Sequence, residues 1–196
     1  MRVKTEDRRQ AIIDAAMQVF REVGYERASM AEISARVGGS KATLYSYFKS
    51  KEELYATGMV EAVEEQRQQM LSRLDLSSAD MAQVLEDFGK ALLTLVTDPE
   101  VLAILRTAMA EGASSSLGPV LYDRGPRSVW NEVAAYLARL METGALRPGD
   151  AEVAALHFKG LLEAGIFEPA LYGASPRMSI EAGARRAVAT FLRAYG

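Results

Sequence analysis

Hydrophobic residues recur at helical spacing along almost the whole chain of 196 residues. Near the N-terminus the apolar positions lie four, seven, eight and eleven residues after the first, at Ile12, Ala16, Val19, Phe20 and Val23. This spacing places them on one face of an amphipathic helix, which Gly24 is expected to end. No segment shows the alternation that is typical of a strand. The pattern therefore predicts an all-α fold of about nine helices.

Turn-forming residues divide the second half of the chain into successive helices. An apolar stripe over residues 81–96 stops at Asp98-Pro99-Glu100, where a cap and a first-turn proline predict the start of another helix. The stripe resumes from Trp130 as far as Gly144. Two further helices are predicted at about 150–167 and 179–195, separated by the turn-rich residues 173–177.

Three helix-start signals and a glycine turn lie close together between Ser29 and Lys51. Ser29 with Glu32 and Ser50 with Glu53 have the spacing of capping boxes, and Ser40 is a third N-cap candidate. Gly38-Gly39 suits a sharp turn, because glycine adopts left-handed backbone angles without steric cost. The segment predicts a short helix, a tight turn, a recognition helix at 41–47 and a long helix from 51 to about 73.

Composition excludes several classes of chemistry. The chain contains no cysteine and one histidine, which removes disulfides, thiolate metal sites and thiol catalysis and leaves little for an imidazole-based site. Adjacent acidic pairs such as Glu64-Glu65 point about 100° apart on a helix and are better suited to solvent than to a substrate. We expect no enzymatic activity, no metal and no cofactor. The sequence has neither a run of about 18 apolar residues nor a signal peptide, so we expect a cytoplasmic protein without a membrane partner.

The net charge of −3 conceals an asymmetry. Residues 1–52 contain ten Lys and Arg against seven Asp and Glu, whereas the remainder contains thirteen against nineteen. Because phosphate binding depends on local positive charge, the basic N-terminal part is compatible with a DNA partner. A solvated basic face without a nucleic-acid partner is the alternative.

The N-terminal segment resembles the DNA-binding region of the TetR family of bacterial transcriptional repressors. The matching positions are Phe20, Gly24, Ser29, Ile33, Gly38, Ser40, Thr43-Leu44-Tyr45, Tyr47-Phe48 and Ser50-Lys51-Glu52. Met30 and Gly39 depart from the usual pattern, which has threonine and valine there. Later segments, FGKALLTL, DPEVLAILR and GALRPGDAEVAALHFKGLL, are similar to the regulatory domains of the AcrR and AefR-like branches. We therefore expect a DNA-binding domain at 1–50 and a ligand-binding and dimerisation domain at 51–196.

A recognition helix projects its first residues into the major groove while its flanks meet phosphates. Leu44 and Phe48 are expected to face inward. The candidates for contacts with base edges are Lys41, Ala42 and Ser46. The candidates for phosphate contacts or for capping at the DNA surface are Ser29, Ser40, Thr43, Tyr45, Tyr47 and Lys51. For Tyr45, half-buried packing is the alternative.

One two-turn helix reads only a few base pairs, so we expect a homodimer on a palindromic operator. The last two predicted helices carry small and apolar residues suited to close helix packing. The dimerisation candidates are Ala155, Ala164, Ala184, Ala187, Val188 and Phe191. The resemblance implies the same two helices, and closure of the subunit's own core is the alternative.

The middle helices supply candidates for a pocket that binds a small hydrophobic or amphipathic effector. The residues are Phe88, Leu92, Leu102, Leu105, Arg106, Met109, Tyr122, Trp130, Met141, His157 and Leu161. Plain core packing is the alternative for each, with a snorkelling arginine and a satisfied histidine as the corresponding alternatives for Arg106 and His157. The sequence thus predicts a ligand-responsive repressor, with a helical protein-interaction adaptor as the alternative function.

Overall fold

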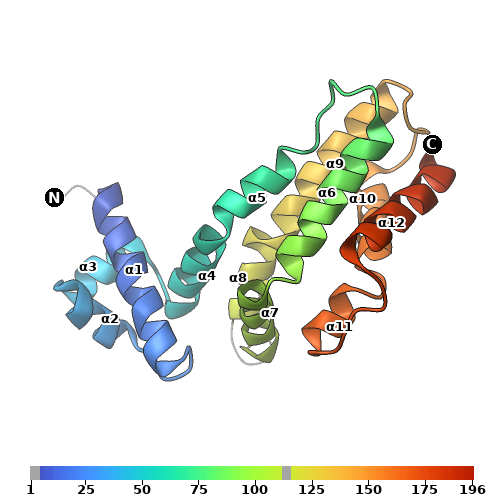
Figure 1. Cartoon of the computed structure of the whole chain (residues 1–196). Helices are drawn as coiled ribbons and strands as arrows, with labels where there is room; N and C mark the ends of the chain where they lie inside the picture. The colour runs from blue at the N-terminus through green and yellow to red at the C-terminus, as the bar shows by residue number, and fades with distance from the viewer. Residues whose placement is uncertain (1–4, 112–115) are drawn as a thin grey trace. The chain divides into compact units, whose positions relative to one another are not determined.

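The computed structural model describes residues 5–111 and 116–196, and within them it contains helices and no strand (Figure 1). The helices are α1 (Glu6–Val23), α2 (Met30–Val37), α3 (Lys41–Tyr47), α4 (Lys51–Ala62), α5 (Glu64–Leu71), α6 (Met81–Val96), α7 (Pro99–Glu111), α8 (Leu117–Arg124), α9 (Pro126–Glu142), α10 (Ala151–Glu163), α11 (Phe167–Leu171) and α12 (Ile180–Tyr195). The all-α class is confirmed. The expected number of about nine was too low, since the described residues form twelve.

Two predicted helices are each divided in the structure. The helix expected over 51–73 breaks at Val63, whose φ of −116° and ψ of 7° leave the helical region, and α5 begins after it without a side-chain cap. No proline or glycine marks this break in the sequence. The helix expected over 150–167 ends at Glu163, because Gly165 turns the chain with a φ of 73°, and α11 follows.

The contacts within the chain form two units. The first comprises the described residues of 1–62 and 108–124, and the second comprises 63–107 and 125–196. The first unit thus includes α4 and α8 together with α1 to α3, and α4 packs against both α1 and α8. The functional division expected at residue 50 stays a prediction.

The core of the first unit is built around aromatic residues of α1, α4 and the loop after α1. The ring of Tyr55 lies 4.8 Å, centroid to centroid, from those of Phe20 and Tyr25. The expected inward face of α1 is confirmed at Ile12, Ala16, Val19 and Phe20, which are buried. Gly58 lets α4 approach α1, because a Cβ at this position would overlap the Sδ of Met17.

The core of the second unit gathers α6, α9, α10 and α12. Phe88, Phe158 and Phe191 have no exposed surface, and the rings of Phe158 and Phe191 lie 4.9 Å apart. Gly89 and Gly183 allow close packing, since a Cβ on Gly89 would overlap the side chain of Leu162 in α10 and one on Gly183 would overlap that of Ile166, which precedes α11. Within the part of the chain that the structure describes, no helix has the length and apolar character needed to cross a membrane.

Candidate nucleic-acid interface

In the helix-turn-helix, Ser29 and Ser40 form the N-terminal capping hydrogen bonds that the sequence predicts. The Oγ of Ser29 accepts a hydrogen bond from the backbone N–H of Glu32, and that of Ser40 accepts one from Thr43, at 3.2 and 3.1 Å. Between the helices, Gly38 adopts the left-handed conformation with a φ of 68°. The Oγ of Ser34 donates to the carbonyl oxygen of Gly39 at 2.8 Å. These bonds fix the turn that sets the direction of α3.

Recognition helix α3 has one buried face and one exposed face. Leu44 and Phe48, expected to face inward, are 2 and 3% exposed. Lys41, Ala42 and Ser46 are exposed on the helix, and Tyr45 is 49% exposed. An ammonium group, a methyl group and a hydroxyl on one exposed face match the groups that contact base edges in the major groove.

The hydroxyls of α3 are also hydrogen-bonded within the chain. The Oγ of Ser46 donates to the carbonyl oxygen of Thr43 at 2.7 Å, so its proton is used and its oxygen is left as an acceptor. The Oγ1 of Thr43 lies 2.9 Å from the Oγ of Ser40. The hydroxyl of Tyr47 accepts a hydrogen bond from the backbone N–H of Thr5 at 3.2 Å. Thr5 is the N-cap of α1, so this bond joins the first turn of α1 to α3.

Lys51 has partners within the first unit. Its Nζ donates to the carbonyl oxygens of Tyr25 and Glu26 at 2.9 and 3.3 Å and lies 4.3 Å from the centre of the Tyr25 ring. These contacts tie the start of α4 to the loop that precedes α2. The expected phosphate contact of Lys51 stays a prediction, and a structural role now stands beside it.

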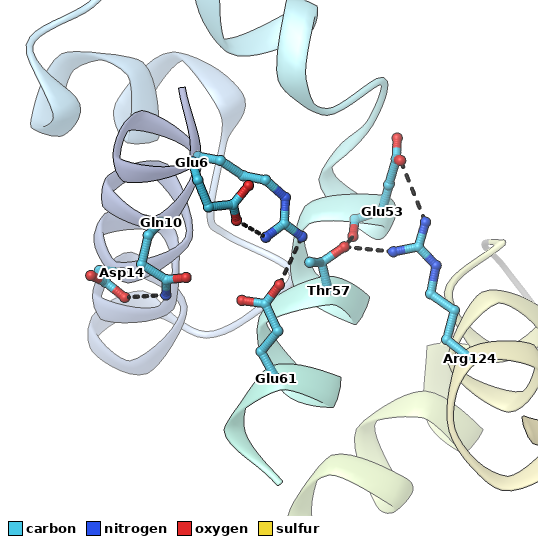
Figure 2. Close-up of polar contacts among 8 residues, drawn as sticks. Glu6, Gln10, Asp14, Glu53, Thr57, Glu61 and Arg124 are labelled. Atoms are coloured by element: carbon cyan, nitrogen blue, oxygen red, sulfur yellow. Dashed lines mark hydrogen bonds and ion pairs between the residues drawn. The ribbon is translucent and has the colours of Figure 1, made fainter. Parts of the chain in front are cut away.

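The turn between α3 and α4 is connected to α8 (Figure 2). One oxygen of Glu53 accepts a hydrogen bond from the backbone N–H of Lys49 at 2.8 Å, and its other oxygen forms a 3.4 Å ion pair with Arg124. Arg124 also donates to the Oγ1 of Thr57 at 2.6 Å, and Thr57 is buried. Through Glu53, Arg124 thereby links α8 to the backbone of Lys49, two residues after the end of α3.

Arg9 makes a corresponding link between α1 and α4. Its guanidinium pairs with Glu6 at 3.0 Å and with Glu61 at 2.7 Å. Glu52 lies near the start of α4. Hydrogen bonds from the backbone N–H of Glu52 itself, from Ser50 and from Tyr25 lower the pKa of its carboxyl below the usual value. An ionised carboxylate in the first turn of a helix is also favoured by the helix dipole. Ionic and polar contacts therefore hold α4 against α1 and stabilise the start of α4.

An open groove lies between the first turn of α1 and the turn before α3. Its lining is formed by Thr5, Arg8, Ser34, Ala35, Gly38, Gly39, Ser40, Ala42, Thr43, Ser46 and Tyr47. Five of these residues are among the nine DNA-contact candidates. Arg8 was not among the candidates from the sequence, because it lies more than thirty residues from α3 and no local motif marks it.

Most of the predicted dimerisation residues are buried inside the second unit. Ala155, Ala184, Ala187, Val188 and Phe191 are 0–3% exposed and belong to its core, so their side chains have no surface left for a partner. This burial favours the alternative, closure of the subunit's own core, and the role of these residues in an interface stays a prediction. Ala164, the residue that follows α10, is exposed. Val153 and Leu156 of α10 are also exposed, by 43 and 55%.

The predicted effector residues do not lie in a single unit. Met109 and Tyr122 belong to the first unit and are 58 and 54% exposed, whereas the other nine belong to the second. Among those nine, Phe88, Leu92, Leu102 and Trp130 are buried, Leu105, Met141 and Leu161 are partly buried, and Arg106 and His157 are exposed. The rings of Phe88 and Trp130 meet edge to face, 6.3 Å apart.

The two polar candidates of this set are bonded within the chain. Arg106 donates to the carbonyl oxygens of Ala170 and Leu171 at 2.9 Å each, which closes the end of α11. The Nδ1 of His157 lies 2.5 Å from the hydroxyl of Tyr195. Both side chains therefore contribute to the structure of the second unit, and their roles toward an effector stay predictions.

Two family models match this chain. The model described as bacterial regulatory proteins of the tetR family matches residues 12–57, which include α2 and α3. The model described as the C-terminal domain of AefR-like transcriptional repressors matches residues 83–196. Together they span the helix-turn-helix and most of the second unit.

Two solved structures and one curated protein that are similar to this chain over most of its length are also named as regulators. A protein from Mesorhizobium loti assigned to TetR-family transcriptional regulators is 28% identical, with a TM-score of 0.79 over 98% of this chain and 100% of its own. The flavonoid-responsive regulator FrrA is 27% identical, with a TM-score of 0.78 over 97 and 98% of the two chains. The HTH-type transcriptional regulator YhgD of Bacillus subtilis is 24% identical over 83% of this chain and 84% of its own.

Proposed function

The chain belongs to the TetR family of bacterial regulatory proteins, and on this premise we propose that it represses transcription as a ligand-responsive homodimer on a palindromic operator. The observation that carries the proposal is the exposed face of α3. Lys41, Ala42, Tyr45 and Ser46 are exposed there, while Leu44 anchors the helix in the core. In this proposal residues 1–50 bind DNA and residues 51–196 bind the effector and the second subunit.

The proposed division of labour on α3 follows the chemistry of its side chains. Lys41 donates to guanine acceptors, Ala42 contacts a thymine methyl group, and Ser46 meets a base edge as an acceptor. Ser29, Ser40, Thr43, Tyr45 and Tyr47 lie at the flanks, where hydroxyls bind phosphate oxygens. A regulator that reads two half-sites on one DNA face needs its recognition helices about 34–36 Å apart, or a multiple of that distance.

The proposed dimer interface uses the exposed side of α10 rather than its buried side. Val153, Leu156, Gly160 and Ala164 are exposed at intervals of three and four residues, which places them on one face. A glycine and an alanine in this stripe allow a second helix to approach closely. The same face of a second copy is the proposed partner, because a two-fold dimer pairs identical surfaces.

The proposed response to an effector uses α8. Helix α8 contacts α4 within the first unit, and its last residue is joined to α9 through Gly125. An effector that binds the aromatic residues of the second unit, such as Phe88 and Trp130, would favour one of two conformations of this segment. Arg124 would transmit the change to Glu53 and Thr57 of α4, the helix that follows α3. Such an effector alters DNA affinity only as far as it binds the two conformations differently.

The exchange of Lys41 and Tyr45 for alanine, made together, tests the proposal. Both side chains are exposed on α3, so the double variant should keep its helicity and its oligomeric state. Its binding to the promoter DNA beside its own gene, measured by fluorescence anisotropy, should fall by two orders of magnitude or more. The base contact of Lys41 accounts for about 1–3 kcal/mol in each subunit, and the loss of the phosphate contact of Tyr45 adds to it.

A helical protein-interaction adaptor is the alternative function. An adaptor would bind no duplex in a sequence-selective, salt-sensitive manner, and the double variant would behave like the wild-type protein. If the wild-type protein shows no such binding with or without candidate effectors, the repressor proposal is wrong.

A further inference from the structure

The groove between α1 and the turn before α3 has the composition of an anion site. Besides backbone and small apolar residues, its lining presents one guanidinium, from Arg8, and six hydroxyl-bearing side chains, with no carboxylate. The hydroxyl-bearing residues are Thr5, Ser34, Ser40, Thr43, Ser46 and Tyr47. We propose that Arg8 binds a phosphate of the DNA backbone in this groove and that Gly39 is the residue that makes room for it.

The position of Arg8 is set by contacts of the first turn of α1. The Oγ1 of Thr5 accepts a hydrogen bond from the backbone N–H of Arg8 at 3.3 Å, and the backbone N–H of Thr5 donates to the hydroxyl of Tyr47. Arg8 is therefore held beside the recognition helix although it is 33 residues from Lys41 in sequence. A phosphate contact from this position would fix the orientation of α3 on the duplex.

The guanidinium of Arg8 is available to a ligand. Among the described residues it has neither a hydrogen-bond partner nor an ion pair, in contrast to Arg9, which pairs with Glu6 and Glu61. Glu6 and Asp7 are nearby in the first turn of α1, but neither lines the groove. A planar guanidinium beside several hydroxyls suits the bidentate geometry of a phosphate group.

Gly39 explains how the guanidinium reaches this place. A Cβ at position 39 would lie 2.8 Å from Nη2 of Arg8, so any side chain there would displace the guanidinium. The backbone of Gly39 is not in the left-handed region, unlike that of Gly38, and its conformation alone does not require glycine. The valine that the family pattern has at this position would occupy the space that Arg8 uses here. Gly39 and Arg8 therefore form one structural feature of this chain.

The inference rests on the proposed function, and its test uses two DNA probes. One is a duplex selected by the wild-type protein from a randomised pool, and the other is a duplex of random sequence. Four variants are compared with the wild-type protein: Arg8→Gln, Gly39→Ala, the combination of both, and the control Arg21→Gln. Arg21 is an exposed arginine of α1 that does not line the groove, so its replacement makes the same change of charge.

Arg8→Gln should weaken binding to both probes by about tenfold or more at low salt, because a charged hydrogen bond is lost in each subunit. The plot of log affinity against log salt should become shallower by about 1.8 for the dimer, which is about 0.9 for each phosphate contact. Gly39→Ala should act in the same direction while the melting temperature is kept, because only the flexible end of Arg8 has to move. The combined variant should be no weaker than Arg8→Gln alone, since both changes remove the same contact.

Equal affinities and salt slopes for Arg8→Gln and Arg21→Gln would overturn the inference, as would additive losses for Arg8→Gln and Gly39→Ala. The two proposals fail in different ways. If the wild-type protein binds random DNA but selects no sequence, the repressor proposal fails and the phosphate contact is still measured on the random duplex. If the wild-type protein binds no duplex at all, both are wrong.

Discussion

Replacement of Lys51 by methionine distinguishes a structural role of this residue from a contact with DNA. The Nζ of Lys51 donates to two backbone carbonyl oxygens and lies over the ring of Tyr25, 4.3 Å from its centre. Methionine keeps most of the aliphatic side chain and removes the charge. The variant therefore tests the ammonium group with little change in packing.

The expected loss follows from these contacts. A hydrogen bond from a charged donor is worth about 1.5–3 kcal/mol, and we assign one such value to the 2.9 Å bond and little to the 3.3 Å bond. The cation–π contact contributes about 0.5–1 kcal/mol at a partly exposed site. A positive charge at the N-terminus of α4 offsets about 0.3–1 kcal/mol of this gain. The free energy of unfolding should therefore fall by about 2 kcal/mol.

Urea unfolding followed by far-UV circular dichroism measures this loss, with Lys49→Met as the control. Lys49 is exposed and lies two residues away, and no contact of its side chain is found among the described residues. The control should change the free energy of unfolding by less than about 0.5 kcal/mol, as surface substitutions do. If both variants are equally stable and Lys51→Met alone gives a shallower salt dependence of DNA binding, the structural role is refuted and the phosphate contact predicted from the sequence is supported.

Three further variants test other parts of the account. Leu156→Arg should convert the proposed dimer to a monomer in sedimentation equilibrium, because it places a charge on the exposed face of α10; a dimer of unchanged stability would place the interface elsewhere. Arg124→Gln should lower the free energy of unfolding by about 1 kcal/mol and DNA affinity severalfold, because the contacts with Glu53 and Thr57 are lost; unchanged DNA affinity would separate α8 from the recognition helix. Glu52→Gln should destabilise the protein more at pH 7 than at pH 3: a lowered pKa gives stability that is present above the carboxyl's unfolded-state pKa and is lost as the pH falls through the folded value. An equal loss at both pH values would contradict this reasoning.

The sequence predicted those parts of the fold that depend on neighbouring residues. The caps at Ser29 and Ser40 and the turn at Gly38 occur as expected, because each hydrogen bond or backbone angle involves residues at most four apart. The stripes of apolar residues also gave the limits of α3, α6 and α12 closely. Local periodicity and capping are sufficient for this level of structure.

The remaining features depend on residues far apart in the sequence. Arg8 meets Gly39, and Arg124 meets Glu53, across separations of 31 and 71 residues, and neither pair has a local signature. Periodicity also does not tell which neighbour an apolar stripe contacts, so the stripe at Ala184 and Val188 is compatible with a partner subunit as well as with the core in which the structure buries it. The break at Val63 has no proline or glycine to announce it.

Selection of duplexes from a randomised pool by the purified full-length protein tests the central claim most directly. The account predicts an enriched motif with two-fold symmetry, whose half-sites are centred about 10–10.5 base pairs apart or a multiple of that. The Lys41 and Tyr45 double variant should enrich no motif while it stays helical and dimeric. Absence of an enriched motif with the wild-type protein, or a motif without symmetry, would contradict a dimeric repressor that reads DNA through α3.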